Sequence, residues 1–135
     1  MIYFLDTNIC IYYLNNSNPY VCEKLEKQPT ESIKIPSIVA AELLFGAEKS
    51  IKREHNMKVF EAFLSIFEIV DFDINAAVQY AVIRAELERK GRVIGGNDIS
   101  IAATVLANDG VLITNNTEEF SRIEKLVIEN WTNIQ

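Results

Sequence analysis

The chain opens with Met1-Ile2-Tyr3-Phe4-Leu5-Asp6-Thr7-Asn8, a short apolar run that ends in an acid and two hydrogen-bonding side chains. The run over 2–5 predicts a short buried strand, and the apolar spacing over 9–14 predicts a helix directly after it. Four more strand-like runs follow, at Ile33–Ile35, Phe67–Val70, Val111–Thr114 and Leu126–Ile128. Strands that alternate with helices indicate an α/β fold whose parallel sheet is covered on both faces. Such sheets bind ligands beyond the carboxyl ends of their strands.

Helical periodicity fills the segments between these runs. Helices are expected at Pro19–Lys27, from Pro36-Ser37 onward, over residues 51–66, from a cap at Asp73 to Arg89 with Gly91 as its end, and from Asn97 or Asp98 to Asn108-Asp109-Gly110. The sequence holds no repeat, no Gly/Ser linker and no long block of charge. Because 135 residues are enough for one core, we expect a single domain over residues 1–135.

Composition limits the partners and the compartment. Hydrophobic residues make up 49% and charged residues 24%, which is typical of a globular protein. The net charge of −6 argues against nucleic acid as a partner, because affinity for phosphates comes largely from Lys and Arg. The first six residues lack the basic start of a secretory signal, and no apolar stretch approaches the roughly 20 residues of a membrane span. We therefore expect a cytoplasmic protein that does not cross a membrane.

Cysteine and histidine offer little chemistry. Cys10 and Cys22 have no companion Cys or His at metal-binding spacing. A disulfide or a zinc site is the alternative to two small reduced thiols, and we expect the thiols. His55 is the only histidine and lies in a polar run, so it is expected at the surface. Because the single histidine is expected at the surface, catalysis by a Ser-His or Cys-His pair is nearly excluded.

Three acids stand out because of their neighbours. Glu42 is the only polar side chain within residues 38–45, so a helix there is expected to be buried all round. Its carboxylate then needs a cation, a hydrogen-bond network or a proton, and a buried ion pair is the alternative to a functional role. Asp98 precedes an almost wholly apolar run, and Asp6 ends the first strand. For both of these, a helix N-cap is the alternative.

The segment Thr114-Asn115-Asn116 ends another strand in hydrogen-bonding side chains, for which a turn is the alternative account. Strand ends and helix starts share one edge of a parallel sheet, so we expect this segment to meet Asp6, Glu42 and Asp98. Carboxylates 4 Å apart repel by about 4 kcal/mol per pair at an effective dielectric near 20. A hard cation such as Mg²⁺ or Mn²⁺ removes that repulsion and supports phosphodiester hydrolysis.

These residues resemble the PIN-domain family, and more narrowly its VapC-type ribonuclease toxins. Each matching piece alone is unspecific, whereas the ordered set is highly specific. The pieces are Phe4-Leu5-Asp6-Thr7-Asn8, Ala40-Ala41-Glu42-Leu43 with Gly46, Ile94-Gly95-Gly96-Asn97-Asp98 with Ile101-Ala102-Ala103, Leu112-Ile113-Thr114-Asn115-Asn116 with Glu119-Phe120, and Glu129-Asn130-Trp131.

The resemblance implies a three-layer α/β/α PIN-like domain with a short central parallel sheet. It implies an endoribonuclease, dependent on Mg²⁺ or Mn²⁺, that acts as the toxin of a toxin–antitoxin pair on structured RNA such as tRNA. A small VapB-like antitoxin would be the partner. The toxin would be a homodimer formed through helices near the middle of the chain. The stretch Phe60–Phe67 could serve that interface or could be core.

The resemblance also implies roles for single residues. Catalysis would fall to Asp6, Glu42, Asp98 and Asn116, with the first three as metal ligands and with Thr7, Asn8 and Thr114 supporting them. Asn116 stands where the wider family often has an acid, so we expect one firmly held ion and a second recruited with substrate. The sequence does not identify the residues that bind substrate. Its basic stretches at 49–58 and 84–92 could guide RNA or be solvated helix faces.

Two other functions compete with this hypothesis. A phosphoacceptor signalling domain also gathers acids at strand ends, but it needs an acid pair after the first strand and a Lys after a late one. Here Asp6 is alone, and residues 114–117 contain no Lys. A catalytically silent binding module on the same fold would be expected to lose the acids, and all three are present.

Overall fold

Five short strands form one parallel sheet in the computed structural model, which describes residues 1–133. The strands are β1 (Tyr3–Leu5), β2 (Ile33–Pro36), β3 (Glu68–Val70), β4 (Val111–Ile113) and β5 (Ile128–Glu129). Their order across the sheet is β3-β2-β1-β4-β5, so β1 is central. Phe4 pairs with Lys34 of β2 on one side and with Leu112 of β4 on the other. All five predicted strands are found, and β5 begins two residues later than expected.

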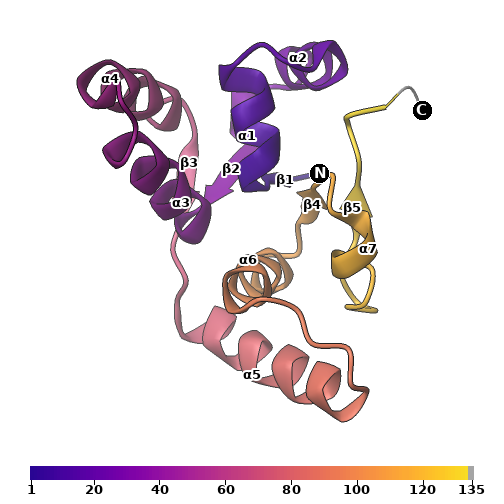
Figure 1. Ribbon diagram of the computed structural model, residues 1–135. Coiled ribbons are helices and arrows are strands. Elements are labelled where there is room, and N and C mark those ends of the chain that lie inside the picture. Colours follow the sequence, from indigo (N-terminus) through magenta and orange to yellow (C-terminus); the bar gives the residue numbers. More distant parts are fainter. Residues whose placement is uncertain (134–135) are drawn as a thin grey trace.

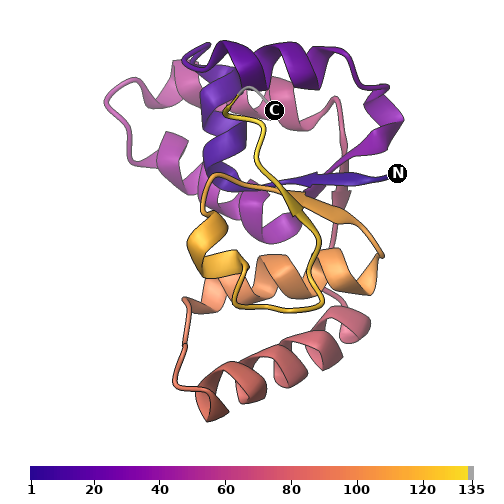
Figure 2. The ribbon, with the colours of Figure 1, turned by 90° about the vertical axis from the view of Figure 1, so that its right-hand side faces the viewer.

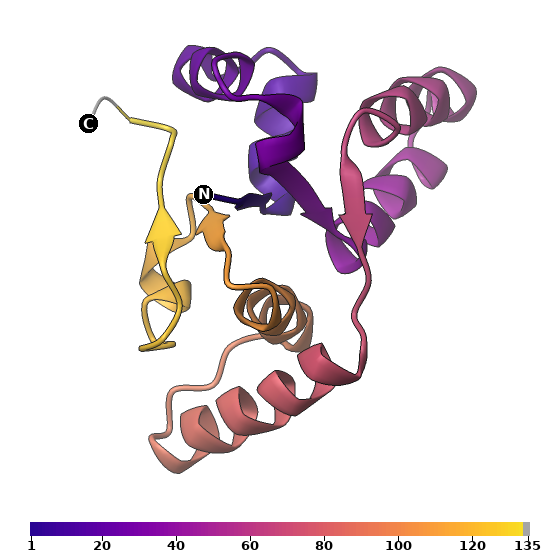
Figure 3. The same ribbon diagram turned by 180° about the vertical axis from the view of Figure 1, so that it is seen from behind.

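Helices cover both faces of this sheet. They are α1 (Thr7–Leu14), α2 (Pro19–Glu26), α3 (Ser37–Glu48), α4 (Arg53–Leu64), α5 (Ile74–Arg89), α6 (Gly96–Ala107) and α7 (Thr117–Phe120), with a 3-10 turn at Thr30–Ser32 before β2. Figure 1 shows α1 and α2 on one side of the sheet and α5 and α6 on the other, and Figure 3 shows the same layers from behind. The three-layer α/β/α fold predicted from the sequence is confirmed.

The connections explain why the two layers form. The chain moves outward from β1 through β2 to β3 and then returns past β1 to β4. Because parallel crossovers are right-handed, this reversal moves the helices to the other face. The neighbours β1 and β4 thus continue into helices on opposite faces, which makes their carboxyl ends the topological switch point. In Figure 2 the strands point toward the edge at which α6 begins and α7 lies.

The core lies on both sides of the central strands. Phe4, Leu5 and Ile113 are fully buried, and α6 is enclosed between the sheet and α5. The expectation that α6 is buried is therefore confirmed, whereas the same expectation for α3 is wrong. Ala41 is exposed and the Phe45 side chain is 63% exposed, because one face of α3 packs against nothing in the described chain.

Local signals set the ends of α5 and α6. Asp73 caps α5, as predicted, by accepting a hydrogen bond from the Ala76 N–H at 3.0 Å. The helix ends at Gly91, whose φ of 65° is the left-handed conformation that favours glycine. The N-cap of α6 is Gly95, so this helix begins one residue before the predicted Asn97.

The less reactive residues lie where the sequence places them. Cys10 is buried and Cys22 is partly buried, and both are free thiols. His55 is exposed. Phe63 is 4% exposed and contacts the rings of Tyr13 and Phe67, so the structure favours the core account of Phe60–Phe67. Through residue 133, no helix combines the length and the apolarity needed to cross a membrane.

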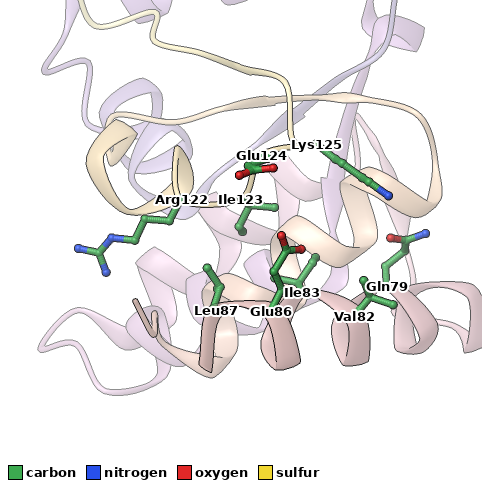
Figure 4. A pocket seen from close by; sticks show the side chains of 9 residues that line it. All are labelled: Gln79, Val82, Ile83, Glu86, Leu87, Arg122, Ile123, Glu124 and Lys125. Atoms are coloured by element: carbon green, nitrogen blue, oxygen red, sulfur yellow. The ribbon is translucent and has the colours of Figure 1, made fainter. Parts of the chain in front are cut away.

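The segment after α7 packs across α5 and holds the loop before α6. Figure 4 shows residues 122–125 facing α5 across a small cavity of about 50 Å³. Lys90 Nζ lies 3.0 Å from carboxylate oxygens of both Glu86 and Glu124. Arg122 Nη1 donates a hydrogen bond of 3.1 Å to the Val93 carbonyl. These contacts fix the loop that leads into the first turn of α6.

Replacing Gly110 by Ala is expected to destabilise the protein by about 1–3 kcal/mol, the usual cost of overpacking a core. An added Cβ would lie 2.5 Å from two ring carbons of Phe4 on the central strand. Urea unfolding, followed by the fluorescence of the buried Trp131, measures the change.

Gly46→Ala is the matched control. Nothing lies within 4 Å of a Cβ at Gly46, which lies within α3. Alanine there is expected to stabilise the protein by about 0.5–1 kcal/mol, its ordinary advantage over glycine in a helix. Equal effects of the two substitutions would show that Gly110 is not tightly packed against Phe4.

Candidate functional site

Asp6 lies at the switch point and is 6% exposed. Its Oδ1 accepts a hydrogen bond of 2.8 Å from the Thr7 N–H, and its Oδ2 accepts one of 2.7 Å from Thr114 Oγ1. Burial raises the pKa of Asp6, and the bonds from Thr114 and Thr7 offset part of that rise. Asp6 is also the N-cap of α1. The capping role and a place in the site thus coexist in one side chain.

Glu42 is joined to Asp6 through Thr7. The Thr7 hydroxyl donates a hydrogen bond of 2.9 Å to Glu42 Oε1, while the Thr7 N–H bonds Asp6. Glu42 is half-buried, not enclosed as the sequence suggested, because α3 keeps an open face. No ion pair of Glu42 occurs within residues 1–133, so the structure gives no support to the buried ion-pair alternative.

Asp98 is the third residue of α6. The N-cap alternative for Asp98 is wrong, because Gly95 holds that position and Asp98 lies inside the first turn. Burial, and then the nearby charges of Asp6, Glu119 and Glu42 in that order, together raise the pKa of Asp98 to about 6. Asp6, Glu119 and Glu42 are therefore close enough to Asp98 to affect its charge state.

Glu119 is an acid of the site that was not among those predicted from the sequence. It lies on α7, where Asn116 Nδ2 donates a hydrogen bond of 3.2 Å to Glu119 Oε2. The Asn116 N–H donates to Thr114 Oγ1 at 2.9 Å, which joins this segment to the Asp6 partner. A spacing of three residues places Asn116 and Glu119 on one side of a helical turn, so the sequence could have predicted their contact.

Not every predicted supporting residue reaches the acids. Thr7 and Thr114 do, through the bonds given above. Asn8 is exposed, and in the part of the chain that the structure describes its side chain makes no hydrogen bond to them. The supporting role of Asn8 stays a prediction.

We call Asp6, Glu42, Asp98 and Glu119 the acidic cluster. It carries uncompensated negative charge, since the ion pairs found within residues 1–133 all lie elsewhere. As these side chains stand, no three Asp, Glu, His or Cys residues of the described chain form a group that could hold a metal ion. Mg²⁺, however, is usually held by one or two carboxylates and several waters, and the cluster supplies such a donor set.

An open recess of about 260 Å³ adjoins the cluster between α3 and α6. Its lining combines the Glu42 carboxylate with Ile38, Ala41, Phe45 and Asn97. A polar chain could therefore approach Glu42 from solvent along the open face of α3. The geometry suits chemistry on an extended substrate at the molecular surface.

Comparison with known proteins gives one consistent match. The family model described as "PIN domain" matches residues 3–126. Ribonuclease VapC2 of Rickettsia felis is 46% identical over 97% of this chain and 98% of its own. The tRNA(fMet)-specific endonuclease VapC of Salmonella typhimurium is 41% identical over 96% of this chain and 97% of its own.

Two solved structures agree with these sequence matches. VapBC2 from Rickettsia felis, bound to a DNA fragment from its promoter, contains a chain with a TM-score of 0.89 at 46% identity, covering 97% of this chain and 99% of that one. DNA-bound VapBC from Salmonella typhimurium contains a chain with a TM-score of 0.91 at 40% identity, covering 97% and 98%.

Asp98→Asn is expected to stabilise the metal-free protein at pH 7.5. The folded-state pKa of about 6 lies above the ordinary 3.8, so ionisation of Asp98 weakens folding progressively between these two pH values; the effect is complete above pH 6 and absent below pH 3.8. The shift corresponds to about 3 kcal/mol, which solvent screening of a partly exposed group reduces to about 1 kcal/mol. Urea unfolding in EDTA at pH 7.5 and 4.5 measures this difference.

The exposed Glu31 provides the control, because it lies in the turn before β2, at the opposite end of the sheet. Glu31→Gln is expected to change stability little at either pH. A gain from Asp98→Asn that is the same at both pH values would contradict the electrostatic account.

Proposed function

The chain belongs to the PIN-domain family and, within it, to the VapC-type branch, and from this premise we propose that it is an endoribonuclease toxin. Its reaction is the hydrolysis of phosphodiester bonds in structured RNA, with tRNA as the first candidate substrate. The observation that carries the proposal is the acidic cluster at the switch point of the sheet, which has no cation beside it within the described chain. The names of the relatives given above support the same reaction class.

The cluster fits a divalent cation, Mg²⁺ or Mn²⁺. The electrostatics of Asp98 support this assignment. The raised pKa of Asp98 arises from burial and from three neighbouring carboxylates, and a divalent cation would relieve that repulsion. Asp6 and Asp98 would be its main ligands, with Glu42 completing the set. When bound, the ion would activate water and stabilise negative charge on the phosphodiester.

The protein side chains would orient the reactants. Thr114 and Thr7 hold the Asp6 carboxylate in one orientation through its two oxygens. Thr7 occupies Glu42 Oε1, so Oε2 is the oxygen that would accept a hydrogen bond from the attacking water. Asn116 fixes Glu119 beside Asp98, and we assign Glu119 the place of a fourth acid at the site.

A small antitoxin is the proposed protein partner. The solved relatives described above are toxin–antitoxin complexes, which supports a VapB-like chain for this protein as well. An acidic cluster without its own cation is suited to a guanidinium from such a chain, because arginine stays charged and binds carboxylates through two parallel bonds.

A homodimer is the proposed assembly, with α5 as its contact. Ile74, Val78 and Val82 lie four residues apart and are 75%, 57% and 51% exposed. Residues at this spacing share one helix face, so α5 presents an apolar stripe to solvent. The stripe is a stronger candidate than Phe60–Phe67, whose Phe63 is buried in the core.

The purified protein is expected to cleave tRNA in Mg²⁺ or Mn²⁺ and to stop in EDTA. Asp6→Asn should lower the cleavage rate at least about 100-fold, because it removes a buried charge at the proposed ion site. Gel analysis of cleavage products measures the rate. Asp109→Asn is the matched control, since Asp109 lies at the far end of α6 with a φ of 52° that asparagine tolerates. Cleavage that survives both EDTA and Asp6→Asn would refute the metal-dependent mechanism.

Light scattering is expected to give the mass of a dimer, and Val78→Glu should give that of a monomer. A charge in the middle of the α5 stripe would lose its hydration in the dimer and keep it in the monomer, so it favours the monomer. Val127→Glu serves as control, because Val127 is 58% exposed outside α5. A monomeric wild type, or a dimer that survives Val78→Glu, would rule out this interface.

A further inference from the structure

A separate recess adjoins the first turn of α6 on the side of α5. It has a volume of about 260 Å³. Its walls are Tyr80 and Arg84 of α5, Val93 and Ile94 of the loop, and Gly96 and Ile99 of α6. Gly96 lies two residues before Asp98, so this recess opens at the end of α6 that carries Asp98, on a different side of the helix. The α3 recess described above also reaches this turn, at Asn97, so the two hollows flank the start of α6.

Arg84 brings a positive charge to this recess. Its Nε donates a hydrogen bond of 2.9 Å to Glu88 Oε2, and its Nη1 donates one of 3.1 Å to Tyr80 Oη. A guanidinium has five N–H donors, so three remain for a ligand. The side chain is 56% exposed, and its ion pair with Glu88 is of the weak surface kind. Arg84 is therefore oriented by its neighbours and still accessible.

The loop wall and the α5 wall of the recess are both held in place. Arg122 is 21% exposed and donates from Nη1 to the Val93 carbonyl at 3.1 Å. The ring of Tyr80 meets that of Phe72 edge-on, with centroids 6.1 Å apart. A ligand would enter a recess whose walls are already ordered, which lowers the entropy cost of binding.

We propose that Arg84 binds a phosphodiester group of the RNA outside the acidic cluster, and so acts as a substrate-positioning residue. This inference rests on the proposed function. Arginine matches phosphate with two parallel N–H···O bonds, and three free donors allow that geometry. The acidic cluster repels an RNA strand, and a cation at the same end of α6 gives the strand a point of attraction outside the cluster.

The test compares Arg84→Gln with Arg89→Gln in tRNA cleavage with Mg²⁺. Arg89 is exposed at the end of the same helix and lines neither recess described above. Arg84→Gln is expected to raise KM about 10-fold with little change in kcat. It should also reduce the slope of the logarithm of the RNA binding constant against the logarithm of salt concentration by about one. Arg84→Lys should recover part of the loss, and Arg89→Gln should leave KM within about two-fold.

Thermal unfolding of each variant shows whether it is folded. Equal KM values for the Arg84 and Arg89 variants would overturn the inference, as would a fall in kcat at unchanged KM. A loss of antitoxin inhibition with unchanged RNA binding would show that the ligand of Arg84 is an acidic group of the antitoxin, which also overturns it. If the wild type cuts no RNA, the proposed function fails; if the wild type cuts and Arg84→Gln matches it, only this inference fails.

Discussion

The structure depends on one buried carboxylate, that of Asp6 on the central strand. Leaving a buried charge without partners costs several kcal/mol. Its two hydrogen bonds are therefore requirements of the fold as well as features of the site. The Thr114 bond links the carboxyl ends of β1 and β4, and the Thr7 bond fixes the first turn of α1. The switch point of the sheet is thus held together by the side chain that we propose as a metal ligand.

Thr7 and Asn116 extend this constraint to the two outer acids. One residue, Thr7, bonds Asp6 through its N–H and Glu42 through its hydroxyl, so α3 is tied to β1 at the acidic cluster. Asn116 ties α7 to the site through Thr114, because its N–H donates to Thr114 Oγ1 and its side chain donates to Glu119. Hydrogen bonds thus hold together carboxylates that repel one another, and this repulsion contributes to the raised pKa of Asp98. A divalent cation at the proposed site would relieve this repulsion.

The sequence predicts the parts of this arrangement that depend on local pattern. Apolar runs predict all five strands, and the composition of residues 99–107 predicts that α6 is buried. The open face of α3 could not be foreseen, because Ala41 and Phe45 have the same apolar character whether or not another element covers them. Glu119 has an acidic neighbour in Glu118, and only the tertiary position of α7 distinguishes the half-buried acid from the exposed one. Which residues of α3 and α7 are covered depends on long-range packing, and local composition does not determine it.

The net charge of −6 describes the whole chain, whereas RNA would meet a local field. Four acids are concentrated at one edge of the sheet, so much of the negative charge lies where a divalent cation would neutralise it. Arg84 lies on α5, in the recess at the end of α6 that carries Asp98, and its ion pair with Glu88 is exposed and weak. A protein of this kind binds polyanions weakly over most of its surface and gains affinity at one place. Selectivity for one RNA then depends on the fit to that place, because general attraction to phosphate contributes little.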